Sequence, residues 1–115
     1  MAKEQNWTLH QGEDKVLRVV VARTNITGWT LAFAVAPAYG ETASFTKTTT
    51  SGIVLTDPTD GVFEVSITDT DTDSLPANDP EDENDYYVWD VKRSDAGEEV
   101  VLAWGKLKLL PKVSA

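Results

Sequence analysis

The chain has 115 residues, no cysteine and a formal net charge of −9. Its length predicts one domain over residues 1–115 with a modest core. The absence of cysteine excludes disulfides, thiol nucleophiles and thiolate metal sites. From Thr48 to Val91 there are twelve acidic residues and neither Lys nor Arg, which argues against a nucleic-acid partner because phosphate binding needs clustered cations. The apolar runs are too short to span a bilayer, so no membrane association is expected.

Residues 1–14 are expected to form an N-terminal arm or an edge strand. Within them Trp7 and Leu9 share one face of a short strand over Asn6–His10. Trp7 is the aromatic side chain that we expect to be most exposed, so Trp7 and Leu9 are candidates for contact with a partner. The next strand, over Lys15–Ala22, is apolar on both faces, and this pattern predicts a central position in a sheet.

The clearest strand lies within Ile26–Val35, after a turn at Gly28. Large apolar residues then occupy every second position, which predicts one buried face. These residues are Trp29, Leu31, Phe33 and Val35. We therefore expect Trp29 to be a core residue.

The Thr-rich segment Ser44–Thr50 is β-prone but weakly apolar, as is typical of an exposed edge strand. Phe45 and Lys47 in this strand are candidates for partner contact, and Lys47 also guards the edge against pairing. A hairpin is predicted next, with strands over Ile53–Leu55 and Val62–Ile67 and a Pro- and Gly-containing turn between them.

One short helical turn is expected near residues 69–75, ended by Pro76. The alternating carboxylates Asp69, Asp71 and Asp73 resemble the start of a calcium loop. The glycine and the bidentate glutamate that such a loop requires are missing. We therefore predict no metal, and these three aspartates are the candidates to check.

The composition of Ala77–Asp85 predicts a solvated acidic loop, and we expect it to be the least ordered part of the chain. Asp82 and Glu83 in this loop are candidates for partner contact. The last predicted strands are Tyr86–Arg93 and Glu99–Leu110, with a bulge or bend at Gly105.

This series of about seven to nine short strands without a long helix predicts an all-β, antiparallel sandwich. The carboxylates lie in predicted loops beside no apolar pocket that would tune a pKa, and His10 is the single histidine. We therefore predict no enzyme, no catalytic residue and no cofactor.

Several segments, in this order, resemble small immunoglobulin-like domains encoded by tailed bacteriophages, such as the N-terminal domain of baseplate upper proteins and capsid decoration proteins. The resemblance runs from about Lys15 onward and rests on Ile26–Val35, Thr49–Ile53, Leu55–Asp57, Gly61–Val65, Leu75–Ala77, Tyr86–Arg93, Val101–Leu107 and Leu110–Pro111. One departure is the acidic insertion Asn78–Asp85, where the family's turn leads almost directly into the tyrosine-containing strand.

The resemblance implies an immunoglobulin-like β-sandwich and a non-enzymatic virion component, assembled in the host cytoplasm. It favours a capsid decoration or cement protein that binds the major capsid protein or other virion proteins, with homo-oligomer formation as a further expectation. A baseplate, neck or tail-fibre adaptor that binds tail or baseplate proteins is the first alternative. A carbohydrate-binding module that uses exposed aromatic side chains is the second, and a small hydrolase that uses loop carboxylates is the third.

Overall fold

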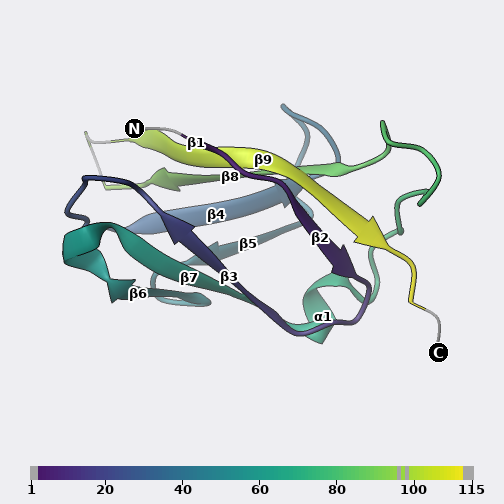
Figure 1. The fold of residues 1–115 in the computed structure, drawn as a ribbon, viewed down its shortest axis with the longest axis horizontal. Coiled ribbons are helices and arrows are strands. Elements are labelled where there is room, and N and C mark those ends of the chain that lie inside the picture. The colour runs from purple at the N-terminus through teal and green to yellow at the C-terminus, as the bar shows by residue number, and fades with distance from the viewer. Residues whose placement is uncertain (1–2, 96, 98, 113–115) are drawn as a thin grey trace.

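The computed structural model describes residues 3–95, 97 and 99–112, so residues 1 and 2 of the expected N-terminal arm lie outside the described part. The described residues form nine strands in two sheets that pack face to face (Figure 1). The strands are β1 (Lys3–Glu4), β2 (Trp7–His10), β3 (Lys15–Val20), β4 (Leu31–Ala36), β5 (Phe45–Thr48), β6 (Ile53–Asp57), β7 (Val62–Ile67), β8 (Tyr87–Arg93) and β9 (Val100–Leu110). The expected all-β sandwich is confirmed.

The topology is that of an immunoglobulin-like sandwich. The larger sheet has the order β1-β9-β8-β4-β5, with β2 also on β9, and the smaller sheet has the order β3-β7-β6. Taken along the chain, the seven strands from β3 to β9 match strands B, C, C′, D, E, F and G of an immunoglobulin domain. The smaller sheet is therefore B-E-D, and the larger sheet contains G, F, C and C′. The single-turn helix α1 (Asp69–Thr72) confirms the predicted helical turn, and a 3-10 turn η1 (Pro58–Asp60) joins β6 to β7.

Aromatic packing occupies the centre of the sandwich. Trp89 of β8 is 1 % exposed and Phe33 of β4 is fully buried. The Trp7 ring stacks on Trp89 with its centroid 4.2 Å away. The Tyr87 hydroxyl donates to the Pro76 carbonyl at 2.7 Å, as in the tyrosine corner of immunoglobulin domains. Antibody domains carry a disulfide cysteine two residues after that tyrosine, and here the large indole of Trp89 fills the place.

The N-terminal strands lie along β9 as a parallel edge of the larger sheet (Figure 1). Between β1 and β2 the Gln5 amide donates to the Trp104 carbonyl, and the Gln5 carbonyl accepts from Trp89 Nε1 at 3.0 Å. A Cβ on Gly105 would lie 1.6 Å from the Gln5 carbonyl oxygen. Gly105 is therefore required for close approach of the N-terminal chain. The bulge or bend predicted there is wrong, since the pairing of β9 with β8 is regular at Gly105 and its register shifts between Val101 and Ala103 instead.

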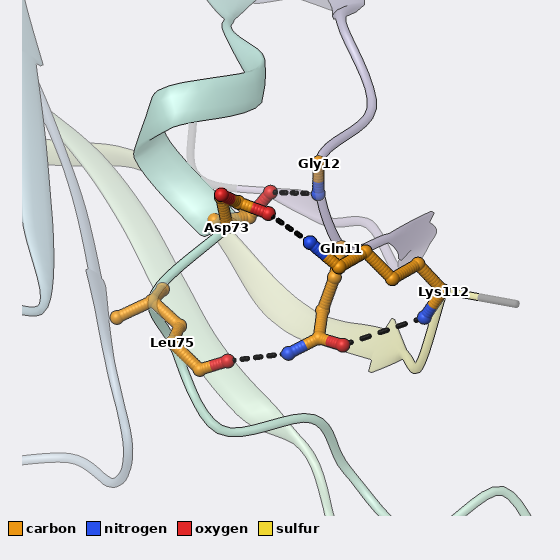
Figure 2. A network of polar contacts seen from close by, with 6 residues as sticks. Gln11, Gly12, Asp73, Leu75 and Lys112 are labelled. Carbon is orange, nitrogen blue, oxygen red and sulfur yellow. Dashed lines mark hydrogen bonds and ion pairs between the residues drawn. The ribbon is translucent and has the colours of Figure 1, made fainter. Parts of the chain in front are cut away.

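A polar network joins the β2–β3 turn to α1 and to the end of β9 (Figure 2). The Gln11 amide donates to the Leu75 carbonyl at 2.6 Å and accepts from the Lys112 backbone. The Gly12 amide donates to the Thr72 hydroxyl at 3.0 Å. Because these contacts join residues 60 to 101 positions apart, they hold both ends of the described chain to the sandwich.

Trp29 is not the core residue that its alternation predicts. A hydrogen bond from the Trp29 amide to the Ile26 carbonyl closes a turn through Gly28, whose φ is 79°, so β4 begins only at Leu31. The Trp29 ring is half-buried, and the Arg93 guanidinium lies over it at 4.2 Å.

The position predicted for the second strand is also wrong. In the smaller sheet β7 is central, and β3 pairs with β7 alone. Val16 of β3 is 57 % exposed, because it lies on the face turned away from the larger sheet. Apolar residues on both faces of β3 therefore do not indicate burial on both faces.

Candidate interaction face

The outer face of the larger sheet combines small and aromatic side chains. The inner face of β4 carries Leu31, Phe33 and Val35, which are fully buried. The alternating positions on the outer face are three half-buried alanines, Ala32, Ala34 and Ala36. Across the neighbouring strands, Asp90 of β8 pairs with Ala34 on one side and with Trp104 of β9 on the other. We call this surface the outer face.

A shallow hollow of about 130 Å³ opens on the outer face, where the β4–β5 loop passes over the sheet. Alanines of β4 and of this loop form much of its wall. Its polar side chains are Tyr39 and Glu41 from the loop and Asp90 from β8, and no cationic residue lines it. We call it the Asp90 hollow.

The Asp90 carboxylate lacks a partner within the described part of the chain. It is half-buried, and neither a hydrogen bond nor an ion pair joins it to another described residue. Burial raises the pKa of Asp90, and the Lys92 charge opposes this only in part. An acid held in this way retains the energetic cost of partial desolvation, which a cation from outside would relieve.

Tyr39 is 64 % exposed at the edge of the hollow, although large aromatic side chains are usually mostly buried. Partial burial raises the pKa of the Tyr39 hydroxyl, and the nearby Glu4, Tyr86 and Asp90 raise it further. The phenol therefore lies in a negative local field. Aromatic side chains are enriched at protein interfaces, so the exposed Tyr39 ring makes this surface a candidate for binding.

A second hollow, of about 360 Å³, lies between the start of the β4–β5 loop and the segment that leads into β8. Pro37, Pro76 and Tyr86 line it, together with Asp85. The Asp85 carboxylate already accepts hydrogen bonds from the Asn78 side chain and the Asp79 amide. Because the Asp85 carboxylate already accepts these hydrogen bonds, the second hollow offers a ligand fewer free acceptor positions than the Asp90 hollow does.

The acidic loop at residues 77–85 is not the loosely held segment that its composition predicts. The Lys108 ammonium of β9 donates to the backbone carbonyls of Asp79, Asp82 and Asp85 at 2.5–2.6 Å. Asn78, which is 7 % exposed, exchanges hydrogen bonds with the backbone of Leu109. The Lys108 ammonium therefore organises the loop. It lies 23–29 positions away in the sequence, so the composition of the loop does not reveal this contact.

The N-terminal partner candidates pack against the sandwich instead of facing outward. Leu9 is 1 % exposed and belongs to the core, so the prediction that it contacts a partner is wrong for this conformation. Trp7 is half-buried between Phe33 and Trp89, with ring centroids 6.3 and 4.2 Å away. Parallel pairing with β9 turns both side chains inward.

The candidates in β5 also point toward the interior of the sandwich. β5 is an edge strand, as expected, but Phe45 is half-buried and packs 6.4 Å from the Phe33 ring. Lys47, two residues on, forms an ion pair with Asp71 at 2.7 Å. An inward-pointing charge on an edge strand is one of the devices that oppose edge pairing, which agrees with the guarding role predicted for Lys47.

The three aspartates near α1 serve the local structure. Asp71 accepts from the Thr68 amide at 2.8 Å and completes a capping box, while Asp73 forms an ion pair with Lys112. The Asp69 amide donates to the carboxylate of Asp14. Among the described residues, no group of three or more His, Cys, Asp or Glu residues could hold a metal ion.

Asp82 and Glu83 are exposed on the acidic loop, and their contact with a partner stays a prediction. The sequence interpretation missed Tyr39 and Asp90. Asp90 carries a detectable signal, because it is a lone acid in a strongly apolar strand opposite alanine-rich β4. Tyr39 carries no such signal, because it lies in the β4–β5 loop and only folding brings this loop to the hollow.

Comparisons with known proteins identify no family for this chain. No family model matches the chain, and no curated protein matches it. Among solved structures, it is similar to the extracellular domain of the voltage-gated sodium channel beta4 subunit, described as a parallel homodimer with a role in cell–cell adhesion. The identity is 13 % and the TM-score 0.40, over 96 % of this chain and 93 % of that one. No helix among the described residues is long and apolar enough to cross a membrane.

Proposed function

We propose that this protein is a non-enzymatic binding module that attaches to neighbouring proteins through the outer face. The observation that carries the proposal is the Asp90 hollow, where an unpaired carboxylate lies beside the exposed ring of Tyr39. Aromatic side chains are enriched at protein interfaces, and a few of them supply most of the binding energy. Alanine positions on β4 let a partner approach the sheet closely.

The setting that we propose is a bacteriophage virion, in which the protein decorates or cements the capsid. This part rests on the order of segments from Ile26–Val35 to Val101–Leu107, which resembles the immunoglobulin-like domains of tailed phages. A baseplate, neck or tail-fibre adaptor is the alternative within the same setting. In each of these roles the protein binds other virion proteins and needs no catalytic residue.

The test is attachment of the protein to particles of the phage whose genome encodes it. Tyr39→Ala truncates a 64 % exposed side chain on the outer face, and Val54→Ala truncates a 59 % exposed one on the smaller sheet. We expect Tyr39→Ala to weaken attachment at least tenfold and Val54→Ala to leave it unchanged, as measured by co-sedimentation with particles. Equal attachment of both variants would exclude the outer face, and absence of the wild-type protein from particles would exclude the virion setting.

A carbohydrate-binding module is a second candidate, because an exposed tyrosine beside a carboxylate also suits a sugar ring and its hydroxyl groups. Trp104 of β9 pairs with Asp90 on the outer face, so a glycan bound there would change tryptophan fluorescence. Titration with a panel of bacterial polysaccharides discriminates the two functions. A saturable fluorescence change that Tyr39→Ala abolishes supports the carbohydrate-binding function, and the absence of any change excludes it for the polysaccharides tested.

A further inference from the structure

We propose that the Asp90 hollow receives the guanidinium group of an arginine presented by the partner protein. The inference rests on the proposed function and deepens it, because it states which chemistry the outer face recognises. It depends on three features of the hollow: its charge, the unmet bonding capacity of Asp90, and the flat aromatic surface next to it.

The charge of the hollow selects a cation. Its lining contains the carboxylates of Asp90 and Glu41 and no Lys or Arg. Glu4 of β1, which is separated from β8 by β9, is still close enough to act electrostatically on Tyr39. Among the described residues, Lys92 is the cation that acts on Asp90, and no ion pair joins the two side chains. A positively charged group therefore finds complementary charge that the protein itself does not neutralise.

The bonding capacity of Asp90 is unused. An ionised carboxylate has about four acceptor positions, and Asp90 uses none of them with described residues. Three other carboxylates, those of Asp71, Asp73 and Asp85, have partners. The Asp90 oxygens still reach water, because no buried side-chain oxygen or nitrogen among the described residues lacks a partner, and a ligand can replace that water with its own donors.

The shape and surface of the hollow favour arginine over lysine. Guanidinium is planar and weakly hydrated, and it can donate two parallel hydrogen bonds to one carboxylate while lying on an aromatic ring. The ammonium of lysine is compact and strongly hydrated, so it loses more on entering a partly desolvated hollow. The alanine walls and the Tyr39 ring present little that could replace its water.

The protein already contains this arrangement internally. At the end of β8, the Arg93 guanidinium lies 4.2 Å over the Trp29 ring, and its Nε donates to Asp95 at 2.7 Å. An aromatic ring, a guanidinium and a carboxylate thus occur together in one satisfied site. The Asp90 hollow supplies the ring and the carboxylate and lacks the guanidinium.

The experiment is a titration of ¹⁵N-labelled full-length protein with N-acetyl-arginine amide, followed by amide chemical shifts. N-acetyl-lysine amide and N-acetyl-citrulline amide are the matched probes, since citrulline keeps the shape of arginine without its charge. We expect saturable shifts at Ala34, Ala36 and Asp90 with arginine, at least threefold weaker binding of lysine, and no binding of citrulline. Equal affinity for arginine and lysine, or shifts located elsewhere, would overturn the assignment.

Two carboxylate variants test the site itself. We expect Asp90→Asn to lose at least fivefold in affinity for N-acetyl-arginine amide and Glu41→Gln, an exposed position, to lose about twofold. Asp82→Asn, on the acidic loop, should bind as the wild type does. Wild-type affinity in Asp90→Asn overturns the proposal. If Asp90→Asn failed to fold, unchanged affinity in Glu41→Gln together with equal binding of citrulline would overturn it.

Attachment to particles separates this inference from the proposed function. If Tyr39→Ala loses attachment while Asp90→Asn keeps it, the outer face is the interface and the arginine assignment is wrong. If both variants lose attachment, both proposals are supported. Sedimentation of the isolated protein tests a second copy as the occupant: self-association that Arg18→Gln or Arg23→Gln abolishes would overturn the assignment to a different protein.

Discussion

The acidic loop and the Asp90 hollow both carry negative charge, but they differ in how many of their polar groups have partners. The loop carries five acids within nine residues, yet Lys108 and local turns satisfy its backbone and hold it in one arrangement. The hollow has only two carboxylates, and one of them, Asp90, is half-buried without a partner. The difference shows that the density of charge does not locate a binding site. A charge whose partner is missing is the better guide.

The physical reason is the different cost of the two arrangements. Exposed loop carboxylates remain hydrated, and their pairwise interactions with mobile surface charges contribute little. A carboxylate that is partly removed from water and given no hydrogen bond lowers the stability of the folded protein. The following changes test each side of this comparison.

Lys108→Met should have the largest effect on stability. It removes the ammonium from three carbonyl oxygens, at Asp79, Asp82 and Asp85, which water can rehydrate only in part. We expect a loss of about 2 kcal/mol in the free energy of unfolding, measured by urea denaturation with tryptophan fluorescence. Lys106→Met is the control, because Lys106 is exposed over the Tyr86 ring and should cost about 0.5 kcal/mol. Equal losses would show that Lys108 does not organise the loop.

Asp71→Asn tests an acid that is fully engaged. Burial alone would raise the pKa of Asp71, but hydrogen bonds from Lys47 and Thr68 and the Lys47 charge together lower it. The ionised form therefore stabilises the fold at neutral pH, and this contribution is lost as pH falls through the lowered pKa. We expect Asn to cost about 1 kcal/mol at pH 7 and progressively less in acid, measured by thermal unfolding across pH. A difference that stays constant down to acidic pH would contradict the pairing.

Asp90→Asn should have the smallest effect and the opposite sign. Because burial raises the pKa of Asp90, the folded state binds the proton more tightly than the unfolded state does. Ionisation then lowers stability as pH rises from the ordinary carboxyl pKa through the raised one. We expect Asn to stabilise the protein at pH 7 by less than about 1 kcal/mol, since solvent still reaches the group, and to have no effect in acid. Destabilisation at pH 7 would reveal a partner for Asp90 and remove the basis of the hollow as a site.

The strands themselves were accessible to sequence reasoning. Alternating apolar residues in segments such as Val62–Ile67 and Leu31–Val35 predict strands with one buried face, and turn residues separate them at regular intervals. The capping residues at Thr68 predict the helical turn that became α1. These are local signals, since each depends on side chains that are two to four positions apart.

What the tertiary structure alone decided is which of these local elements lie beside one another. Trp29 lies outside the core because a turn through Gly28 delays β4. Trp7 and Leu9 face inward because β2 pairs in parallel with the far end of the chain. Lys108 reaches the acidic loop across 23–29 positions of sequence. The alternation of apolar and polar residues thus determined the sandwich class. The Asp90 hollow exists only because folding brings the β4–β5 loop over β8, and the residues that line the hollow include no cation.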